Sequence, residues 1–224
     1  MPNQLALPFG VRSAHGREDF IVAPSNEQAF RFVERWPDWP ARVAAIHGPK
    51  GCGKTHLASV WQAASGASCI QASALSPDAL LAFDAQAAVV VEDLDSTEPS
   101  EYRDRALMAL FERPAGWLLF TAARPPHEWR ARIADLRSRF DSLLSFAMWA
   151  PDETLLLGLI GKHFADRQLD VPDAVRRRIL THVERTPEAV AAFVAQADQL
   201  ALAEKRAITE RLVLELIEAG DGGG

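Results

Sequence analysis

The chain has 224 residues, of which 48% are hydrophobic and 24% charged, which is ordinary for a globular protein of one large or two small domains. Its net charge of −6 does not suggest the broad basic surface of most DNA-binding proteins, and no apolar run is long enough to cross a membrane. Two cysteines, Cys52 and Cys69, indicate no disulfide framework, so we expect a cytoplasmic protein.

An apolar stretch stands near the start of the chain. Residues 4–9 read QLALPF, with Leu5, Leu7 and Phe9 at alternate positions and Pro8 between the last two. Alternation is typical of a strand, but proline cannot donate to a sheet ladder, and no basic residue precedes the stretch as it would in a signal peptide. A frayed terminus and a linear peptide that docks into pockets on a partner both remain open at this point.

From Arg42 onward, short apolar runs alternate with helical patterns. We expect strands over residues 41–48, 68–71, 87–95, 116–122 and 142–148. We expect helices over residues 54–64, 76–83 and 98–114, and two short helices within residues 125–140. Ser76 and Pro77 are the expected N-cap and first residue of the second helix. Apolar strands that alternate with helices predict an α/β fold, in which helices cover both faces of a parallel sheet.

After Pro151 the pattern becomes purely helical. Apolar residues recur at helical spacing over residues 152–168, 172–184, 187–205 and 209–220, and Pro172 and Thr209 mark plausible helix starts. We therefore expect a C-terminal α-helical subdomain over residues 151–219. The Gly-rich residues 220–224 predict a disordered tail.

A phosphate-binding loop joins the first strand to the first helix. Residues 48–55 read GPKGCGKT, which fits the pattern GxxxxGK[ST] in the strand-to-helix context that supports the motif. Backbone N–H groups and the helix N-terminus would hold phosphate oxygens, while Lys54 reaches the β- and γ-phosphates and Thr55 offers its hydroxyl to Mg²⁺. A chance Gly-rich turn is the alternative. The predicted nucleotide-binding residues here are Gly48, Gly51, Cys52, Gly53, Lys54, Thr55 and His56.

Two adjacent acids, Glu92 and Asp93, end the third strand. Phosphate-loop ATPases hold magnesium with an acid at this position, and a second acid orients the attacking water. We therefore assign Glu92 to the metal, together with Thr55, and Asp93 to catalysis. The usual first residue is Asp, and because magnesium demands tight geometry, the longer Glu92 side chain predicts weak metal binding. Two solvent-facing acids at a loop start are the alternative interpretation.

Two features follow the fourth strand. This class of ATPase carries a polar γ-phosphate sensor there, and Thr121 is the only nearby candidate, since Ala122 and Ala123 have no polar group. Residues 135–140 then read DLRSRF, a short helix whose arginines suit an arginine finger that acts on a neighbour's nucleotide. From spacing alone, an ordinary surface arginine is the more frequent explanation.

These motifs together resemble the DnaA family of AAA+ proteins. The resemblance covers Asp19 to about Ala150 well and the helical lid more loosely, and it is carried by DFIVAPSNEQA, GPKGCGKTHL, VVVEDLD, ARPP, LRSRF and APDETLL. It implies an AAA+ core over residues 19–150, preceded by residues 1–18 and followed by the lid. The family's adenine-side residues fall on Phe20, Ile21, Val22 and Asn26, and its arginine finger falls on Arg139.

Within this family, the whole chain resembles the Hda proteins. They begin with a peptide like residues 4–9 and end after the lid, whereas an initiator continues into a helix-turn-helix domain. The resemblance implies that the peptide docks on the DNA-loaded sliding clamp, the β subunit of DNA polymerase III, through Gln4, Leu5, Leu7, Pro8 and Phe9. It further implies DnaA as a partner whose ATP is hydrolysed in trans, ADP or ATP with possible Mg²⁺ as cofactors, possible self-association and little direct DNA binding.

The lid departs from the family pattern. A sensor arginine is expected near the start of a lid helix, yet Glu188 falls there, with Arg185 just upstream. A carboxylate facing the phosphates would repel them. Together with Glu92 and the missing polar sensor, this predicts a nucleotide binder with poor intrinsic hydrolysis and ADP as its resident ligand.

Two other functions are compatible with the motifs. A DnaC-like helicase loader or another DNA-bound AAA+ initiation factor would need a basic surface stripe, which the acidic balance does not favour. A metabolic phosphate-loop kinase would need a site for a phosphoryl acceptor, and the lid sequence shows none.

Overall fold

The structure is a computed structural model, and it describes residues 16–84 and 86–221. The proposed clamp-binding peptide lies outside these described residues, as do residues 222–224. None of the helices within the described ranges is long and apolar enough to cross a membrane.

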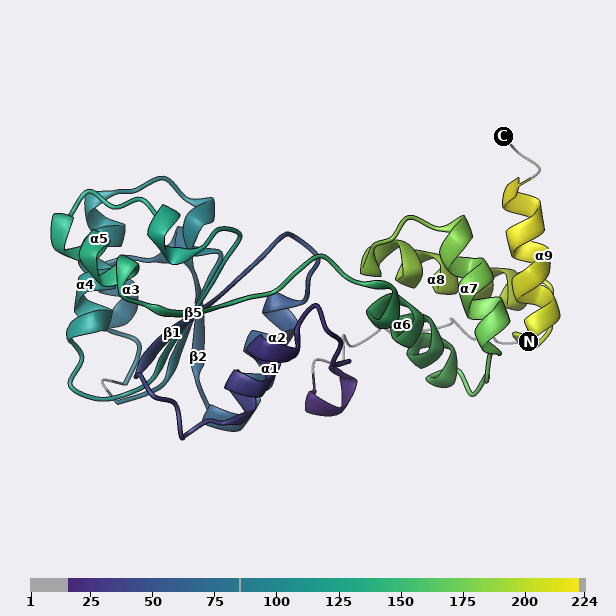
Figure 1. The fold of residues 1–224 in the computed structure, drawn as a ribbon, viewed down its shortest axis with the longest axis horizontal. Coiled ribbons are helices and arrows are strands. Elements are labelled where there is room, and N and C mark those ends of the chain that lie inside the picture. Colours follow the sequence, from purple (N-terminus) through teal and green to yellow (C-terminus); the bar gives the residue numbers. More distant parts are fainter. Residues whose placement is uncertain (1–15, 85, 222–224) are drawn as a thin grey trace, which may run out of the picture.

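A parallel five-stranded sheet forms the centre of the larger part of the protein (Figure 1). Its order is β2-β3-β4-β1-β5, with β1 paired to β4 on one side and to β5 on the other. The expected parallel sheet is therefore confirmed. The strands are β1 Val43–His47, β2 Ser68–Gln71, β3 Val89–Glu92, β4 Leu118–Ala122 and β5 Leu144–Ala147. Ligands of open α/β sheets bind at the carboxyl ends of the strands, and β1, between β4 and β5, leads there into the phosphate loop.

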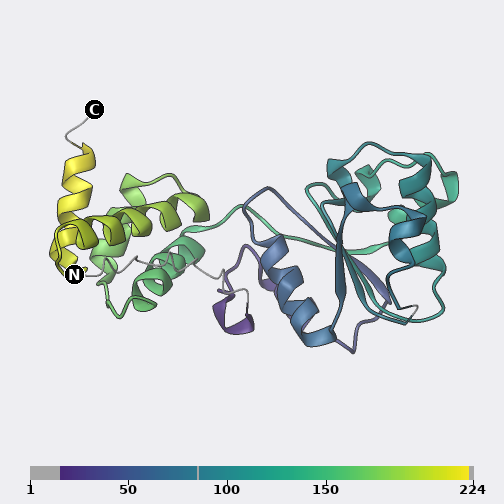
Figure 2. The same cartoon turned by 180° about the vertical axis from the view of Figure 1, so that it is seen from behind.

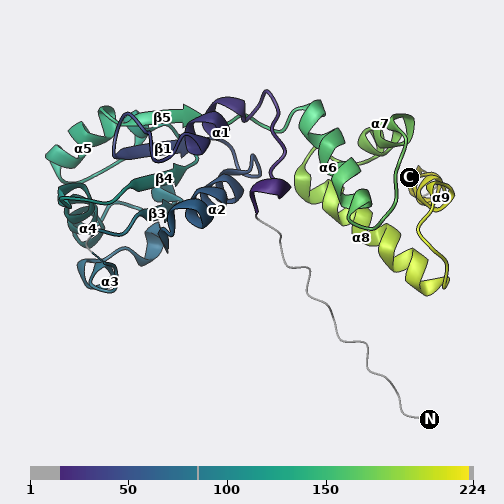
Figure 3. The same cartoon turned by 90° about the horizontal axis from the view of Figure 1, so that it is seen from below.

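Helices cover both faces of the sheet. One face is covered by α1 (Glu27–Glu34) and α2 (Lys54–Ser65). The other face is covered by α3 (Pro77–Leu80), α4 (Glu101–Glu112) and α5 (Ala134–Asp141). Two views show α1 and α2 between the sheet and the C-terminal helices, so that α5 lies on the face turned away from them (Figure 1, Figure 3).

Short side-chain caps define several helix starts. Ser76 accepts a hydrogen bond from the Ala79 N–H at 3.1 Å, with Pro77 at the first helical position as expected. Thr209 accepts from the Leu212 N–H at 3.3 Å and precedes α9 (Glu210–Asp221). Each cap satisfies a backbone donor that the helix itself leaves without a partner.

The structure adds detail that the sequence pattern did not predict. Helix α1 was not expected, and the pair of helices expected within residues 125–140 consists of a 3-10 turn, η4 (Pro126–Glu128), and α5. Three further 3-10 turns are η1 (Arg17–Asp19), η2 (Ala72–Ala74) and η3 (Leu94–Ser96).

The C-terminal part is a lid made of helices (Figure 2). It has its own apolar core. It consists of α6 (Glu153–Ala165), α7 (Asp173–His182), α8 (Pro187–Ala203) and α9. Ile160 on α6, Ile179 on α7 and Val194 on α8 are buried together with Leu212 of α9. Helix α9 continues to Asp221, two residues into the expected tail.

Candidate functional site

A pocket of about 470 Å³ lies where the phosphate loop, the segment before α1 and the lid meet. The predicted residues that line it are Phe20, Ile21, Asn26, Gly51, Cys52, Gly53, Lys54, Thr55, His56 and Asp93. The lid contributes Leu155, Leu159, Pro187 and Glu188. Five of the residues predicted for the site and lying in the described part of the chain are not part of its lining: Gly48, Val22, Glu92, Thr121 and Arg139.

Two glycines of the phosphate loop have a steric reason to be glycine. A side chain on Gly48 would begin 2.1 Å from the backbone oxygen of Met148, a distance that no carbon atom can occupy. Gly53, the N-cap of α2, has a φ of 98°, where other residues are strained. The loop is thus held close to the end of β5 and turns directly into α2. This geometry brings the backbone of residues 51–54 to the pocket.

Lys54 lies inside the loop. Its side chain is almost fully buried, and its ammonium donates to the carbonyl oxygens of Gly48 at 2.8 Å and Pro49 at 2.9 Å. Burial raises the pKa of the neighbouring Cys52 thiol although Lys54 opposes the shift, so the thiol stays neutral at pH 7. The loop therefore carries one net positive charge from its buried side chains.

Aromatic rings border the pocket beside the start of α2. Phe20 stacks on Phe30 with 5.2 Å between ring centroids and meets His56 edge to face at 5.1 Å. Asn26 accepts from the Ala23 N–H at 2.9 Å, and its amide donates to the Ile21 carbonyl at 3.0 Å. Asn26 thereby holds the 21–26 turn in shape, a role that its position in the sequence did not reveal.

The lid is fastened to this same segment. Lys162 of α6 and Asp19 form an ion pair of 2.5 Å, and the Ser25 N–H donates to the Asp152 carboxylate at 2.9 Å. Ile21 packs on Gly158 of α6 so closely that a methyl group on Gly158 would lie 3.2 Å from the Ile21 Cγ2. The segment before α1 and the lid are therefore held together by both polar and apolar contacts.

The two acids after β3 have different surroundings. Glu92 is 7% exposed, and its carboxylate accepts a 2.6 Å hydrogen bond from the Gln71 amide. Asp93 adopts a φ of 53°, and its N–H donates to the Thr121 hydroxyl at 3.1 Å. Thr121 is fully buried and outside the pocket lining, so it positions Asp93 and does not reach a ligand directly.

The oxygen donors in the pocket lining are the carboxylates of Asp19, Asp93 and Glu188, the Thr55 hydroxyl and the Asn26 amide. Within the described ranges, no group of three or more His, Cys, Asp or Glu side chains could hold a metal ion. Of the two predicted metal ligands, Thr55 lines the pocket, whereas Glu92 is outside its lining. The Asp93 carboxylate, which was assigned to catalysis, lines the pocket together with Thr55.

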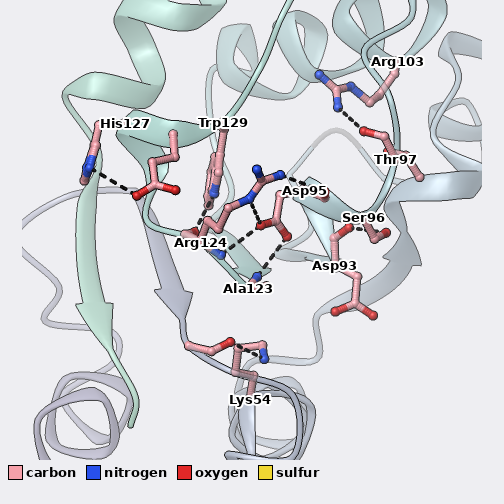
Figure 4. Close-up of polar contacts among 12 residues, drawn as sticks. Lys54, Asp93, Asp95, Ser96, Thr97, Arg103, Ala123, Arg124, His127 and Trp129 are labelled. Atoms are coloured by element: carbon pink, nitrogen blue, oxygen red, sulfur yellow. Dashed lines mark hydrogen bonds and ion pairs between the residues drawn. The ribbon is translucent and has the colours of Figure 1, made fainter.

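A third acid, Asp95, ties η3 to the end of β4 (Figure 4). Its carboxylate accepts from the N–H groups of Ala123 at 2.9 Å and Arg124 at 2.8 Å, and from Nε of Arg124 at 3.1 Å. Burial of Asp95 favours a higher pKa, but these hydrogen bonds outweigh it, and the pKa lies below its usual value. The sequence placed this acid near the site without indicating its partners.

The lid presents a carboxylate to the phosphate loop. Glu188, in the first turn of α8, lines the pocket, and a methyl group on Gly51 would lie 3.3 Å from its Oε2. Arg185 is directed elsewhere, because its guanidinium pairs with Glu153 at 3.3 Å. Of the two residues considered for this lid position, Glu188 is therefore the one that faces the loop.

Arg139 lies apart from the pocket, on α5. Its Nε donates to Asp135 at 3.0 Å, and its guanidinium lies 5.6 Å from the centroid of the Phe111 ring. Arg137, two residues earlier, makes no hydrogen bond or ion pair through its side chain with the described part of the chain. Of the two arginines on α5, Arg139 is therefore the one whose side chain is oriented by contacts within the described part of the chain.

A buried ion pair fixes the loop that leads into α5. Asp104 is fully buried and accepts from Arg103 at 2.9 Å, from the Arg132 N–H at 2.5 Å and from the Ile133 N–H at 3.3 Å. Arg103 in turn donates to the Arg130 carbonyl at 2.5 Å. The start of α5 is therefore anchored to α4 by hydrogen bonds to Arg103 and Asp104, both of which are buried.

Comparison with known proteins relates this chain to DnaA. The chromosomal replication initiator protein DnaA from two strains of Caulobacter vibrioides is 28% identical over 177 residues, which cover 67% of this chain. The chain spans 36% of the length of these relatives. No protein-family model matches the chain.

Solved structures show the same fold. Domain III of Thermotoga maritima DnaA has a TM-score of 0.70 at 14% identity and covers 92% of this chain and 96% of that domain. AMPPCP-bound DnaA from Aquifex aeolicus has a TM-score of 0.64 at 16% identity, over 81% of this chain and 64% of that one. The RuvB branch migration motor of Thermotoga maritima has a TM-score of 0.69 at 15% identity, over 92% and 72%. The chain is therefore similar in sequence to DnaA over 67% of its length and shares the fold of DnaA domain III.

Proposed function

We propose that the chain is an Hda-like regulator of chromosome replication, which docks on the DNA-loaded sliding clamp and stimulates hydrolysis of ATP bound to the initiator DnaA. The observation that carries this proposal is the position of Arg139 on α5, a helix on the sheet face turned away from the lid (Figure 1), together with its absence from the lining of the chain's own pocket. A guanidinium there suits a nucleotide held by a neighbouring protein. The homology to DnaA supports the initiator as that neighbour.

Arg139 would act as an arginine finger. Its planar guanidinium can place two N–H donors on the γ-phosphoryl oxygens and neutralise the charge that develops there during transfer. The buried Arg103–Asp104 pair supports this role because it holds the loop before α5 in place. Such support matters because an arginine finger must reach its target with little freedom of movement.

The chain's own pocket would hold ADP or ATP. The N–H groups of residues 51–54 and the α2 N-terminus would bind phosphate oxygens, and Lys54 would exchange its two loop carbonyls for the phosphates. Phe20 and Ile21 would lie along the base. Thr55 and Asp93 would serve as the protein's oxygen donors to Mg²⁺, which supplies charge neutralisation when bound. The AMPPCP bound to a DnaA of the same fold supports this assignment.

Intrinsic hydrolysis would be slow in this pocket. Thr121 is committed to the Asp93 backbone, so no polar side chain at the end of β4 is placed to sense a γ-phosphate. The Glu92 carboxylate is committed to Gln71. The nucleotide would accordingly serve to hold the lid and core in one arrangement, while the catalytic contribution is made to the partner.

Residues 4–9 would provide attachment to the clamp. An extended peptide with alternating apolar side chains suits a preformed hydrophobic groove, and Pro8 reduces the conformational freedom lost on binding. Attachment to a clamp on DNA would restrict the stimulating activity to replicated, clamp-loaded chromosomes and so prevent re-initiation.

A reconstituted reaction tests this proposal. DnaA carrying radiolabelled ATP is mixed with this chain, with clamp loaded on circular DNA, and with each component omitted in turn. We expect hydrolysis to accelerate only when the chain and the loaded clamp are both present. Equal hydrolysis with and without this chain would contradict the proposal.

A DNA-bound AAA+ factor, such as a helicase loader, is the second candidate. It is favoured by a hollow of about 500 Å³ beside η4, whose border includes Arg130, Arg132 and Arg137. A DnaA of the same fold has been solved with AMPPCP and single-stranded DNA. Fluorescence anisotropy with labelled single-stranded DNA separates the candidates, since a loader should bind it with a steep salt dependence and the proposed regulator should bind it weakly.

A further inference from the structure

An arginine-rich hollow, which we call the η4 hollow, lies beside η4 and shares no lining residue with the nucleotide pocket. Its volume is about 500 Å³, and its border includes Arg130, Arg132 and Arg137. A smaller hollow of about 120 Å³ adjoins it, and the residues that line both are Glu98, Pro99, Trp129 and Arg130. On a chain with a net charge of −6, three arginines around one hollow are a local exception.

Two of these arginines have no partner within the described residues. The side chains of Arg130 and Arg137 are exposed, and neither makes a hydrogen bond or an ion pair with the described part of the chain. Arg130 does not pair even with Glu98, although both residues line the two hollows. Arg132, by contrast, donates to the Pro99 carbonyl at 3.0 Å. The guanidinium groups of Arg130 and Arg137 are therefore available to a ligand.

The charges around the η4 hollow are mixed. Besides the three arginines and His127, its border includes the carboxylates of Glu98 and Glu128. The phosphates of a nucleic acid suit a groove of continuous positive charge, and two carboxylates in the groove would repel them. A protein surface carries both signs of charge, and a guanidinium fits a carboxylate with two parallel hydrogen bonds. The η4 hollow therefore suits acidic side chains of a protein better than a nucleic-acid backbone.

The smaller hollow adds an unsatisfied donor. Thr97 lines it, and the Thr97 hydroxyl is buried without a hydrogen-bond partner among the described residues. A buried hydroxyl with no partner costs free energy, which a carboxylate entering beside Arg130 would recover. The other charges of this hollow are already paired, as Arg124 with Asp95 and Arg103 with Asp104.

The loop that carries the arginines is held in place. The Trp129 Nε1 donates to the Arg124 carbonyl at 2.7 Å (Figure 4), and the Asp104 carboxylate accepts from the Arg132 N–H. The Trp129 ring also meets Phe140 of α5 edge to face, with 5.1 Å between the ring centroids. A site that is already ordered loses less entropy on binding than a flexible one.

We propose that the η4 hollow is a docking site for an acidic segment of a protein partner, whose carboxylates pair with Arg130 and Arg137. This inference deepens the proposed function, on which it rests for the identity of the partner, DnaA. Arg137 and Arg139 both lie on α5, so docking at the η4 hollow would hold the partner beside the helix that carries the arginine finger.

Fluorescence anisotropy of a labelled polyglutamate peptide with the full chain tests the site without DnaA. We expect the wild type to bind the peptide, and the double variant Arg130→Gln/Arg137→Gln to lose about tenfold in affinity, the usual value of two exposed charge pairs. Arg31→Gln/Arg35→Gln removes the same charge from exposed positions at α1 and should bind like the wild type. All four positions are exposed, so both variants should keep the wild-type melting temperature.

The same proteins distinguish an acidic protein from a nucleic acid. Labelled oligothymidylate, at the same ionic strength, should bind more weakly than polyglutamate. Tighter binding of oligothymidylate that is lost in Arg130→Gln/Arg137→Gln would assign the η4 hollow to nucleic acid and overturn the proposal. Equal binding of polyglutamate by this variant and the wild type, or no binding by either, would also overturn it.

The stimulation reaction with loaded clamp then tests whether DnaA is the partner. In Arg130→Gln/Arg137→Gln, the DnaA concentration that gives the half-maximal rate should rise about tenfold, while the rate at saturation is kept because Arg139 is intact. A lower rate at saturation with an unchanged half-maximal concentration would overturn the docking role. If the wild type does not stimulate hydrolysis at all, the proposed function and DnaA as the partner fall, and the polyglutamate result alone decides whether the site stands.

Discussion

Asp135 lies one helical turn before Arg139 on α5, and its carboxylate accepts a 3.0 Å hydrogen bond from Nε of Arg139. The bond uses one edge of the guanidinium and orients the side chain along the helix. Ion pairs four residues apart on an exposed helix contribute only about 0.3 kcal/mol, so Arg139 can exchange this partner for a phosphate at little cost. Asp135 therefore orients the arginine without trapping it.

Removal of the Asp135 carboxylate tests whether this contact restrains the arginine. In Asp135→Asn, we expect stimulation of DnaA-bound ATP hydrolysis to stay within about twofold of the wild type, because the ion pair is weak. Hydrolysis is measured in single-turnover reactions with loaded clamp. A loss as large as that caused by removing Arg139 would mean that Asp135 takes part in the reaction itself.

Lys54→Ala should weaken ADP binding. The ammonium is the cation of the phosphate loop, and a charged hydrogen bond to phosphate contributes about 1.5–3 kcal/mol, so we expect a loss of roughly 10- to 100-fold in affinity. Lys205→Ala, a change in the lid far along the chain from the loop, serves as the control. Equal dissociation constants for Lys54→Ala and the wild type, measured by titration calorimetry, would contradict the assignment of the loop.

Asp95→Asn should destabilise the protein in a way that depends on pH. The folded-state pKa of Asp95 is lowered, so its ionised form contributes stability above the unfolded-state pKa, and this contribution disappears as the pH falls through the folded-state value. We expect a loss of about 1–3 kcal/mol at pH 7, since the N–H groups of Ala123 and Arg124 lose a charged acceptor. Urea denaturation should show the difference between variant and wild type shrinking below about pH 4. A difference that stays constant from pH 7 to pH 3 would exclude a role for the charge.

Replacement of Gln4, Leu5 and Leu7 by Ala should abolish clamp binding. Each leucine buried in a clamp pocket would contribute about 1.5–3 kcal/mol. The loss of both would weaken a micromolar interaction by roughly 100-fold or more, beyond what the assay detects. Surface plasmon resonance on immobilised clamp measures the change, and the ADP affinity of the same variant verifies that the nucleotide site is intact. Undiminished clamp binding would refute the docking peptide.

Features that depend on neighbouring residues in the chain were predicted correctly from the sequence. Apolar runs predicted the parallel strands, because a strand covered by helices on both faces must be apolar throughout. The glycine spacing of the phosphate loop predicted the turn at Gly48 and Gly53, because side chains at these positions would clash or strain the backbone. Helix α1 was missed because its N-cap, Asn26, directs its side chain back to Ile21 and Ala23 and not to the helix. A cap pattern therefore did not mark its start.

Long-range contacts were the part that sequence reasoning did not reach. The Asp95 carboxylate meets the end of β4, 28 residues away, and Asp104 meets the loop before α5 at the same separation. Thr121 was expected to sense phosphate, and its burial under Asp93 depends on how β3 and β4 pair. Each of these contacts is set by strand order and packing, which residue spacing does not encode.

The most direct test of the trans-acting arginine is single-turnover hydrolysis of DnaA-bound ATP, with loaded clamp and saturating Arg139→Ala protein. The variant should bind clamp and ADP like the wild type but lose the stimulation, by roughly 10³-fold or more if the whole effect comes from the finger. Arg139→Lys should not restore it, because an ammonium lacks the planar fork, and Arg137→Ala should cost less. Full stimulation by Arg139→Ala would contradict the account.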